Sequence, residues 1–301
     1  MTQHKKQFLW RKDKLVVRAP AKINLMLLIA GKRPDGFHEI ETIMAKVNWY
    51  DELTIETRSE PGIEVTCNGP YWAPEGKDNL IYKACELFFR NCGKTPQIKV
   101  TLTKNIPAGT GLGSASSDAA AALMGLNQFA KLNIGLDQLE TMAAKLGSDV
   151  NFFLGEPLAL CTGRGEKIEK IEKRFDFSAL LFIFDINVST KAVYEAYKHD
   201  SKRYSNLKEE LDTFLRNNDI YSAAKKCINM LESTCFSLHG QLSELKCTIE
   251  ALGIGPVALS GSGSAMYYLL GEKDRTQTAA HQKLIKNSVN CESVVVSNNR
   301  W

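Results

Sequence analysis

Three glycines and a group of serines stand close together in the stretch Lys104–Asp118, which reads K-N-I-P-A-G-T-G-L-G-S-A-S-S-D. Gly109, Gly111 and Gly113 can adopt positive φ and let the backbone approach a phosphate closely. Serine hydroxyls and the N–H groups of a helix start supply donors for an anion. The alternative is a tight turn with serine caps. The alternating glycines favour an anion-binding loop, without identifying the anion.

Two common phosphate motifs do not fit this loop. A P-loop has the pattern G-x-x-x-x-G-K-[ST], and no lysine follows Gly113. The dinucleotide fingerprint G-x-G-x-x-G requires a glycine where Ser114 stands, and an acidic residue at the end of the next strand. The loop therefore represents another class of phosphate site.

The residues on either side of the loop predict the elements that hold it. Residues 98–102 alternate apolar and polar side chains, which predicts a strand. An alanine-rich helix is expected to begin near Ser114 and to end near Leu126. A strand, a glycine loop and a helix start in this order can turn backbone N–H groups towards a phosphate.

Strands and helices are interspersed along the remainder of the chain, which indicates an α/β or α+β fold. Ala19-Pro20-Ala21 is expected to separate the first two strands. Asp78 is expected to cap one helix, and Ser189 is expected to cap a short helix that carries Tyr194. Charged, aperiodic residues at 169–176 are a candidate domain border. We expect further strands at 15–18, 23–29, 37–47, 53–57, 64–67, 158–161, 179–186, 257–259, 265–270 and 293–297, and helices at 79–92, 136–146, 207–217, 219–231, 238–251 and 275–286.

The composition restricts the classes of protein to consider. The 301 residues, 44% of them hydrophobic, suffice for one large or two ordinary domains. The formal charge of +4 does not indicate a nucleic-acid surface, and no apolar run is long enough to span a membrane. Eight cysteines without C-x-x-C pairs or histidine partners indicate a reduced, cytoplasmic protein. The basic residues between Lys5 and Lys14 are expected to form a solvated arm.

Three motifs occur in a fixed order: P-A-K-I-N-L at 20–25, I-P-A-G-T-G-L-G-S-A-S-S-D-A-A-A-A-L at 106–123, and L-S-G-S-G-S-A at 259–265. This ordered set is similar to the GHMP kinase superfamily of small-molecule ATP kinases. Further segments resemble the branch that phosphorylates the 2-hydroxyl of 4-diphosphocytidyl-2-C-methyl-D-erythritol in non-mevalonate isoprenoid synthesis. They are D-G-F-H at 35–38, D-N-L at 78–80, L-G-S-D-V at 146–150, G-R-G-E at 163–166 and V-S-T at 188–190.

The resemblance, which runs from about Val17 to the end, implies a two-domain fold. Residues 1–170 would form a nucleotide domain similar to ribosomal S5 domain 2. Residues 171–301 would form a ferredoxin-like domain, the last of them able to pack back on the first domain. The site would lie in the cleft between them and use ATP and Mg²⁺. The expected partners are ATP and a cytidine diphosphate sugar alcohol, without nucleic acid or membrane, for a monomer or weak homodimer.

Lys22 and Asp149 match the catalytic lysine and aspartate of the family. Asp149 would handle the hydroxyl proton, and Lys22 would neutralise charge beside it. Without the resemblance, a solvated strand lysine and a helix-end aspartate with local turn bonds would be the simpler interpretations. No carboxylate in the matched motifs besides Asp149 suits Mg²⁺, which can be held mostly by phosphate and water.

The resemblance also implies binding residues. Phe37 and Tyr194 would stack on the two faces of the cytosine ring, and His38 would read its edge. Two core aromatics are the alternative interpretation. Asn24, Thr190, Ser262 and Gly263 would contact the rest of the acceptor or the phosphates. ATP would be bound by the glycine loop and by two residues of an adenine pocket: Pro107, Ala108, Gly109, Thr110, Gly111, Leu112, Gly113, Ser114, Ala115, Ser116, Ser117, Asn79 and Lys104.

Three positions depart from the usual family pattern. Phe37 replaces a commoner tyrosine, Ser148 an alanine, and Asn151 a proline whose absence puts the stiffness of the segment behind Asp149 in doubt. Two alternatives stay open. The chain can be another GHMP kinase acting on homoserine, mevalonate or a sugar, or a silent nucleotide-binding sensor.

Overall fold

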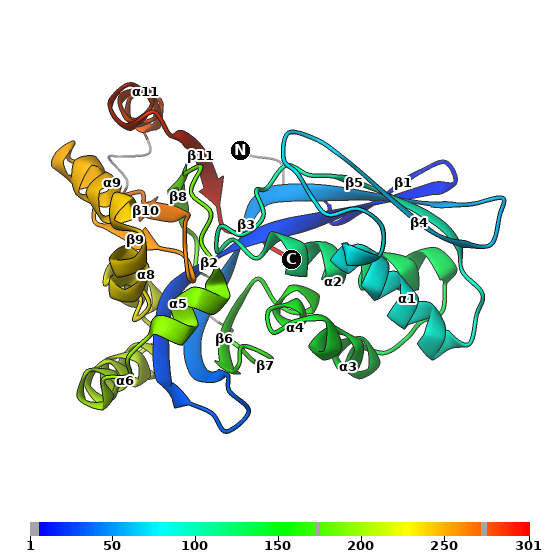
Figure 1. Ribbon diagram of the computed structural model, residues 1–301, viewed down its shortest axis with the longest axis horizontal. Helices are drawn as coiled ribbons and strands as arrows, with labels where there is room; N and C mark the ends of the chain where they lie inside the picture. The colour runs from blue at the N-terminus through cyan, green and yellow to red at the C-terminus, as the bar shows by residue number, and fades with distance from the viewer. Residues whose placement is uncertain (1–5, 173–174, 272–275) are drawn as a thin grey trace.

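The computed structural model describes residues 6–172, 175–271 and 276–301. Within these residues the strands form two sheets that lie side by side (Figure 1). The larger sheet has seven strands in the order β1-β2-β3-β5-β4; in addition, β6 pairs with β3, and β7 pairs with β6. Its strands are β1 (Phe8–Arg11), β2 (Lys14–Lys32), β3 (His38–Thr57), β4 (Gly62–Asn68), β5 (Gln97–Thr103), β6 (Leu158–Gly163) and β7 (Lys167–Lys170).

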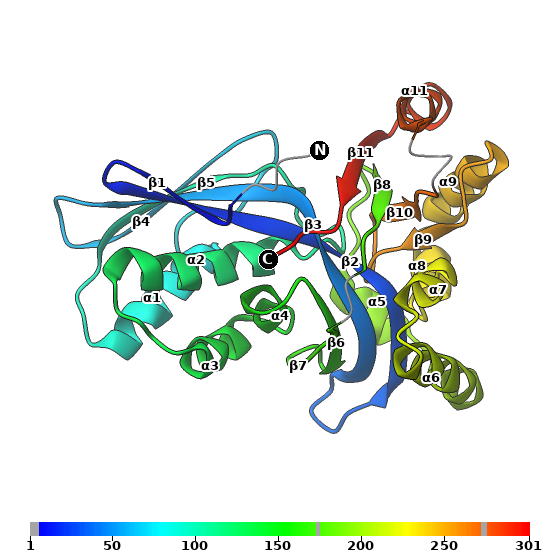
Figure 2. The ribbon, with the colours of Figure 1, turned by 180° about the vertical axis from the view of Figure 1, so that it is seen from behind.

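β2 and β3 form one long antiparallel hairpin that runs through both halves of the molecule (Figures 1 and 2). The sequence predicted four shorter strands here, which was wrong. The register of the pair shifts between Pro20 and Ala21, so the proline lies at an irregularity and does not end the strand. Such irregularities tolerate a residue that cannot donate a ladder hydrogen bond.

Four helices cover one face of the larger sheet (Figures 1 and 2). Gly125 of the central helix faces Ile55 and Val17, where a Cβ would meet side-chain atoms at 2.6 and 2.8 Å, so the helix packs very close to the sheet. The cap of the first helix is Asn79, whose side chain accepts from Ile81 N–H, and not Asp78 as expected. The helices are α1 (Leu80–Cys92), α2 (Ser114–Ala130), α3 (Leu136–Leu146) and α4 (Val150–Leu154), preceded by the 3₁₀ turn η1 (Gly76–Asp78).

The smaller sheet has four antiparallel strands in the order β11-β8-β10-β9 within the described residues. Ser189 caps the first helix of this half through Ala192 N–H, as predicted. The helix predicted at 219–231 ends at Lys225, and the next helix begins at Glu232. The elements are β8 (Ser178–Ile183), β9 (Val257–Leu259), β10 (Met266–Leu269), β11 (Glu292–Ser297), α5 (Thr190–Ala196), α6 (Ser201–Arg216), α7 (Ile220–Lys225), α8 (Glu232–Leu238), α9 (Gly240–Ala251) and α11 (Thr278–Val289).

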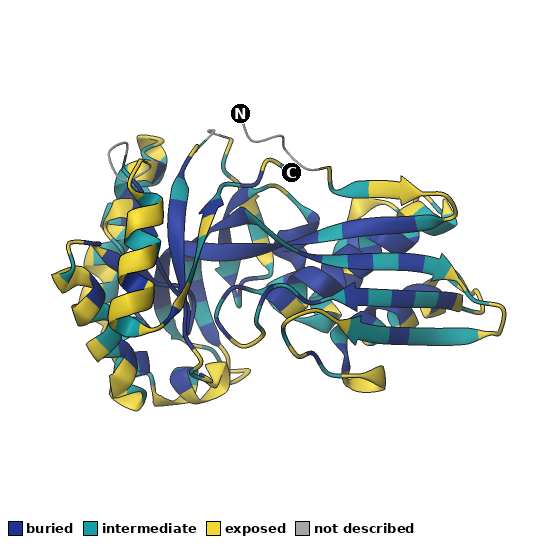
Figure 3. Ribbon diagram, turned by 90° about the horizontal axis from the view of Figure 1, so that it is seen from above, coloured by how far each residue is buried: buried dark blue, intermediate teal, exposed yellow. Residues whose placement is uncertain are grey.

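The hydrophobic core crosses the expected border at 170/171. One buried cluster joins the smaller sheet and its helices to residues 21–29 and 40–47 of the β2–β3 hairpin. The chain end returns to β3, where Asn299 N–H donates to Lys46 O and Trp301 stacks on Tyr50 with ring centroids 5.5 Å apart. Buried residues follow the strands of both sheets in Figure 3. The two halves therefore share their packing.

The N-terminal segment is not a solvated arm over residues 8–11. β1 pairs antiparallel with β2, with Phe8 opposite Val17, and Trp10 stacks on Phe129 of α2 at 5.8 Å between centroids. Lys5, part of the predicted basic arm, lies outside the described residues. None of the helices in the described ranges has the length and apolar character needed to cross a membrane.

Candidate active site

A cavity of about 710 Å³ lies where the β2–β3 hairpin, the glycine loop, the start of α2 and the helix α5 meet. Residues distant in sequence line it together, including most of the predicted site. The predicted residues in its wall are Lys22, Asn24, Phe37, His38, Gly109, Gly111, Gly113, Ser114, Ala115, Ser116, Asp149, Thr190, Tyr194 and Ser262.

The glycines of the loop are required by close approach as well as by backbone angle. Gly109, Gly111 and Gly113 have φ of +72°, +77° and +70°. A Cβ on Gly111 would lie 2.1 Å from the carbonyl oxygen of Ser260, and one on Gly113 would lie 3.0 Å from Cγ of Lys22. A side chain at Gly111 would therefore push the glycine loop away from the second Gly/Ser loop, which is the motif at 259–265. A side chain at Gly113 would displace Lys22.

The start of α2 faces the cavity. Ser114, Ala115 and Ser116 form the first turn of this helix and line the cavity wall. The first N–H groups of a helix have no partner within it, and the dipole makes this end positive. The loop and helix start thus supply the donors and the field that an anion needs.

A chain of hydrogen bonds fixes the orientation of Lys22. The Thr42 hydroxyl donates to Met26 O at 2.7 Å, so it must accept from Asn24 Nδ2 at 2.9 Å. The Asn24 amide oxygen is thereby turned towards Lys22, whose Nζ donates to it at 2.6 Å. Lys22, Asn24 and Thr42 are all buried, which makes each of these bonds costly to lose.

Asp149 completes the group at the mouth of the cavity. Its Oδ2 lies 3.5 Å from Lys22 Nζ, and its side chain is 29% exposed. It precedes α4 but makes no side-chain cap hydrogen bond to that helix. The alternative interpretation, a helix-end aspartate occupied by turn bonds, therefore does not describe this residue. The carboxylate is held beside a buried ammonium group and remains accessible to a ligand.

Aromatic side chains form another part of the cavity wall. His38 lies 5.3 Å from Tyr194 between ring centroids, while Phe37 is 51% exposed and carries the Arg164 guanidinium 4.8 Å from its ring centre. Burial, and to a smaller extent Asp149, raises the pKa of Tyr194 above its ordinary value. Burial lowers the pKa of His38. This end of the cavity offers flat rings and a neutral imidazole, which suit a planar base.

Lys104 and Asn79 do not line the cavity. Lys104 is buried, and its Nζ bonds Asp51 Oδ2 at 2.5 Å, Asp118 Oδ2 at 2.7 Å and Ser114 Oγ at 3.0 Å. Burial raises the pKa of Asp118, and the adjacent Lys104 ammonium group opposes that rise. The buried Asn79 amide caps α1 and donates to Pro74 O. Both side chains make structural hydrogen bonds, and their place beside the adenine stays a prediction.

The remaining predicted residues lie around the loop and do not line the cavity. Leu112 and Ser117 are buried in its base. A Cβ on Gly263 would lie 3.1 Å from Cys235 Sγ and 3.2 Å from Leu259 Cδ1. Pro107, Ala108 and Thr110 line a separate cavity of about 600 Å³ on the side of the smaller sheet.

The structure adds residues that sequence reasoning missed. Thr42 reaches Asn24 only through the pairing of β2 with β3, so no local signal marks it. Arg164 was visible as the arginine of G-R-G-E. Asn229 is buried, donates to Leu259 O and Gly261 O, and so holds the second Gly/Ser loop. Asn151, which stands where proline is usual, donates to Glu166 O at 3.2 Å and ties α4 to the turn after β6.

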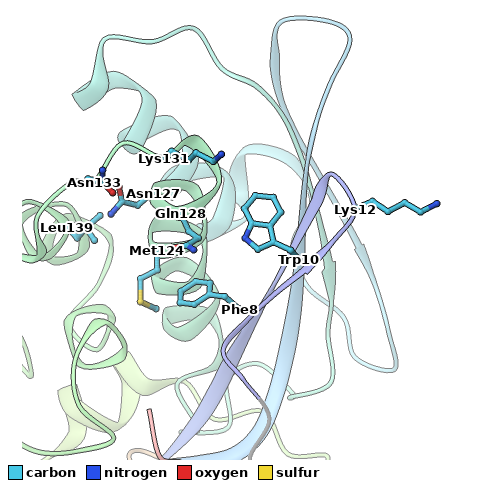
Figure 4. Close-up of a pocket in the computed structure, with 9 residues that line it drawn as sticks. All are labelled: Phe8, Trp10, Lys12, Met124, Asn127, Gln128, Lys131, Asn133 and Leu139. Atoms are coloured by element: carbon cyan, nitrogen blue, oxygen red, sulfur yellow. The ribbon is translucent and has the colours of Figure 1, made fainter.

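A second large cavity, of about 660 Å³, lies between β1 and the C-terminal half of α2 (Figure 4). Phe8, Trp10, Lys12 and Met124 are among the residues that line it. None of the predicted site residues line it.

The oxygen atoms in the wall of the main cavity are compatible with a Mg²⁺ ion that is bound mainly by the phosphates of a ligand. In the described parts of the chain there is no group of three His, Cys, Asp or Glu side chains that could hold a metal by themselves. Asp149 and the hydroxyls of Ser114 and Ser116 are oxygen donors in the cavity wall. Mg²⁺ accepts a site with one or two protein oxygens when phosphates and water complete its octahedron.

Comparison with known proteins identifies the family of the chain. Residues 79–155 match the family model described as GHMP kinases N terminal domain. The chain is 35% identical over 262 residues to 4-diphosphocytidyl-2-C-methyl-D-erythritol kinases of Bacillus cereus and Bacillus anthracis, covering 87% of this chain and 90% of each relative.

Solved structures share the fold. A crystal structure of 4-(cytidine 5'-diphospho)-2C-methyl-D-erythritol kinase has a TM-score of 0.74 and 29% identity, covering 95% of this chain and all of that one. Homoserine kinase from Cytophaga hutchinsonii has a TM-score of 0.75 at 19% identity, with 98% of both chains covered. At that identity the second likeness concerns the fold alone.

Proposed function

The chain belongs to the 4-diphosphocytidyl-2-C-methyl-D-erythritol kinases of the GHMP family, and from this premise we propose that it transfers the γ-phosphoryl group of ATP to the 2-hydroxyl of that acceptor. The products would be ADP and the 2-phosphate, an intermediate of isoprenoid precursor synthesis. One observation carries the proposal. A single cavity contains an anion-binding helix start, the Lys22–Asp149 pair and an aromatic end for a base.

The side chains have distinct roles in this reaction. The acceptor oxygen attacks the γ-phosphorus, its proton passes to the Asp149 carboxylate, and the bond to the β–γ bridging oxygen breaks to release ADP. Lys22 stabilises the charge on the oxygens around the transfer. Mg²⁺ would be held mostly by phosphate and water, with the Asp149 carboxylate and the serine hydroxyls near it, and would supply further neutralisation of the phosphates.

The two substrates would bind at opposite ends of the cavity. The glycine loop, Ser114, Ala115 and Ser116 would bind the ATP phosphates. Phe37 and Tyr194 would stack on the cytosine, with His38 at its edge and Asn24, Thr190 and Ser262 towards the rest of the acceptor. Thr190 Oγ1 and Ser262 Oγ lie 2.8 Å apart, which supports a shared hydroxyl surface there.

Steady-state kinetics test this assignment. ADP release should depend on the diphosphocytidyl acceptor and not on homoserine or mevalonate. Phe37→Ala and Tyr194→Ala should each raise the KM for the acceptor by roughly fivefold to a hundredfold, because a stacked base contributes on the order of 1–3 kcal/mol. Tyr221→Ala, at a half-exposed ring outside the cavity, is the control. Turnover of homoserine or mevalonate, with none of the cytidine acceptor, would refute the proposal.

We also propose that the protein works in the cytoplasm as a monomer or weak homodimer. Its eight cysteines are free thiols, which supports a reducing compartment. Light scattering across a range of protein concentrations measures the oligomeric state.

A further inference from the structure

Arg164 occupies a turn between β6 and β7 that turns its side chain into the cavity. Its flanking residues Gly163 and Gly165 have φ of +74° and +112°, and its N–H donates to Glu166 Oε2 at 2.6 Å. The guanidinium lies 4.8 Å from the centre of the Phe37 ring. The backbone of the turn and an aromatic face therefore hold a cation at one place in the wall.

The charge of Arg164 is only weakly neutralised. Its Nε lies 4.0 Å from Glu166 Oε2, and that oxygen already accepts from the backbone N–H of Arg164. The other carboxylates of this wall have closer partners: Asp35 lies 3.1 Å from Arg33, Asp149 lies 3.5 Å from Lys22, and Glu195 lies 3.8 Å from Lys191. Asp35 also interacts with the charge of Arg164, at longer range. A side chain 30% exposed, with five N–H donors and no short ion pair, can bind an anion.

Arg164 lies between Phe37, where the base would bind, and Asp149, where the acceptor hydroxyl would bind. Phe37 is against its guanidinium, and the next residue, Gly165, is so close to the catalytic carboxylate that a Cβ there would lie 3.3 Å from Asp149 Oδ1. A ligand with its base at Phe37 and its alcohol at Asp149 must carry its linking group past Arg164. In a nucleoside diphosphate derivative that group is the diphosphate.

We propose that Arg164 is a specificity-determining residue that binds the diphosphate of the acceptor and so selects nucleoside diphosphate derivatives over uncharged nucleosides. This inference rests on the proposed function. A guanidinium matches two phosphate oxygens through parallel N–H bonds, which a lysine does not reproduce. Its contact with the Phe37 ring keeps the fork in place, and Phe37 remains 51% exposed, which leaves ring surface for a base.

Binding of CDP and of cytidine tests the proposal, measured by calorimetry with the nucleotide loop filled by a non-hydrolysable ATP analogue. We expect the wild type to bind CDP more tightly than cytidine. Arg164→Met should weaken CDP binding by about tenfold to a hundredfold, the range for hydrogen bonds to a charged group. It should change cytidine binding by no more than about fivefold, which is the contribution of an exposed cation–π contact.

Two further variants separate charge from packing. Arg164→Lys should keep part of the preference for CDP, and Arg90→Met, at an exposed arginine of α1 paired with Glu86, should keep all of it. In turnover, Arg164→Met should raise the KM for the acceptor and leave the KM for ATP unchanged.

Some results would overturn the inference. One such result is that Arg164→Met weakens the binding of CDP and of cytidine by the same factor, which would mean that Arg164 only supports Phe37. The other is that the wild type binds CDP and cytidine with equal affinity. A preference for CDP that Arg164→Met abolishes, in a protein that does not phosphorylate the diphosphocytidyl acceptor, would support the diphosphate site and refute the proposed reaction.

Discussion

Lys22 and Asp149 differ in exposure in a way that suits the roles proposed for them. The ammonium group is buried and fixed by Asn24, whereas the carboxylate is partly exposed and reaches the cavity. A fixed cation beside a mobile phosphoryl group stabilises charge without reorganising. The accessible carboxylate can meet the hydroxyl of an entering acceptor.

At the residue scale, Asp149→Asn removes the proton acceptor and keeps the size of the side chain. General base catalysis contributes about 10²- to 10⁴-fold, so kcat should fall by that range. ATP affinity should stay within a few-fold of the wild type, as measured by ligand titration. Asp137→Asn, in the first turn of α3, is the control. A silent nucleotide-binding sensor would show no change in turnover.

Thr42→Val tests whether the orientation of Asn24 matters. Valine has the shape of threonine but cannot hold Asn24 Nδ2 or donate to Met26 O. Each buried group left unsatisfied costs about 1–3 kcal/mol, so we expect kcat to fall by about tenfold or more with the KM for ATP unchanged.

Thr101→Val is a matched control, because Thr101 bonds Thr66 at 3.2 Å on the larger sheet, away from the cavity. Equal kinetic effects of both variants would indicate a general loss of stability, and the orienting role of Thr42 would be wrong.

At the element scale, the two Gly/Ser loops and β2 meet at Ser260. Its Oγ donates to Gly111 O at 3.1 Å and accepts from Asn24 N–H at 3.4 Å. Tyr267 OH donates to Asn24 O at 2.9 Å, so elements of the smaller sheet hold both backbone groups of Asn24. The β2–β3 register shifts just after Asn24, which frees these groups from the ladder.

Ser260→Ala should therefore loosen the contact between the loops. One hydrogen bond contributes about 0.5–1.5 kcal/mol, so the KM for ATP should rise by about twofold to tenfold. Ser264→Ala is the control, because Ser264 lies in the same loop, is equally buried and has no hydrogen-bond partner for its hydroxyl among the described residues. If both variants have the same KM for ATP, the contact at Ser260 has no effect on the loop.

Lys46 links β3 to the end of α4 and makes stability depend on pH. Its Nζ donates to Phe153 O at 3.1 Å and Gly155 O at 2.6 Å, and burial lowers its pKa to about 7. The unfolded chain keeps this proton up to the ordinary pKa of 10.5, so between these values it binds more protons than the folded protein. The Lys46 contribution to stability should therefore rise from pH 7 to 9.

Urea unfolding at several pH values measures this dependence. Lys46→Met should remove the rise, whatever its absolute stability, since methionine does not titrate. An identical slope in wild type and variant would contradict the assignment.

At the scale of the whole molecule, the shared core predicts one cooperative unfolding transition. The β2–β3 hairpin belongs to the buried clusters of both sheets, and Trp301 at the chain end packs on Tyr50 of β3. Trp301→Ala should lower the unfolding free energy by about 1–2 kcal/mol, from the lost ring contact and its burial, and keep a single transition. Trp72→Ala is the control, because that ring is 76% exposed. Two separate thermal transitions in calorimetry would show that the halves fold independently.

Features encoded within a few neighbouring residues were predictable. The glycine loop, the strand before it and the helix after it follow from backbone permissiveness and hydrophobic period. The ordered motifs identified the kinase family and its two candidate catalytic residues. The helix at 136–146 matches α3, and the Ser189 cap was also correct.

Features that depend on packing were decided by the tertiary structure. The extent of β2 and β3 depends on their pairing, which continues on both sides of Pro20. The proline, which locally predicts the end of a strand, therefore does not end β2. Lys104 was expected at the adenine from the family resemblance alone; its contacts with two buried carboxylates from different elements have no local signal in the sequence. The contact of Lys22 with Asp149, the support from Thr42 and the place of Arg164 join segments distant in sequence. Only the fold brings such segments together, because no local interaction distinguishes their pairing from any other.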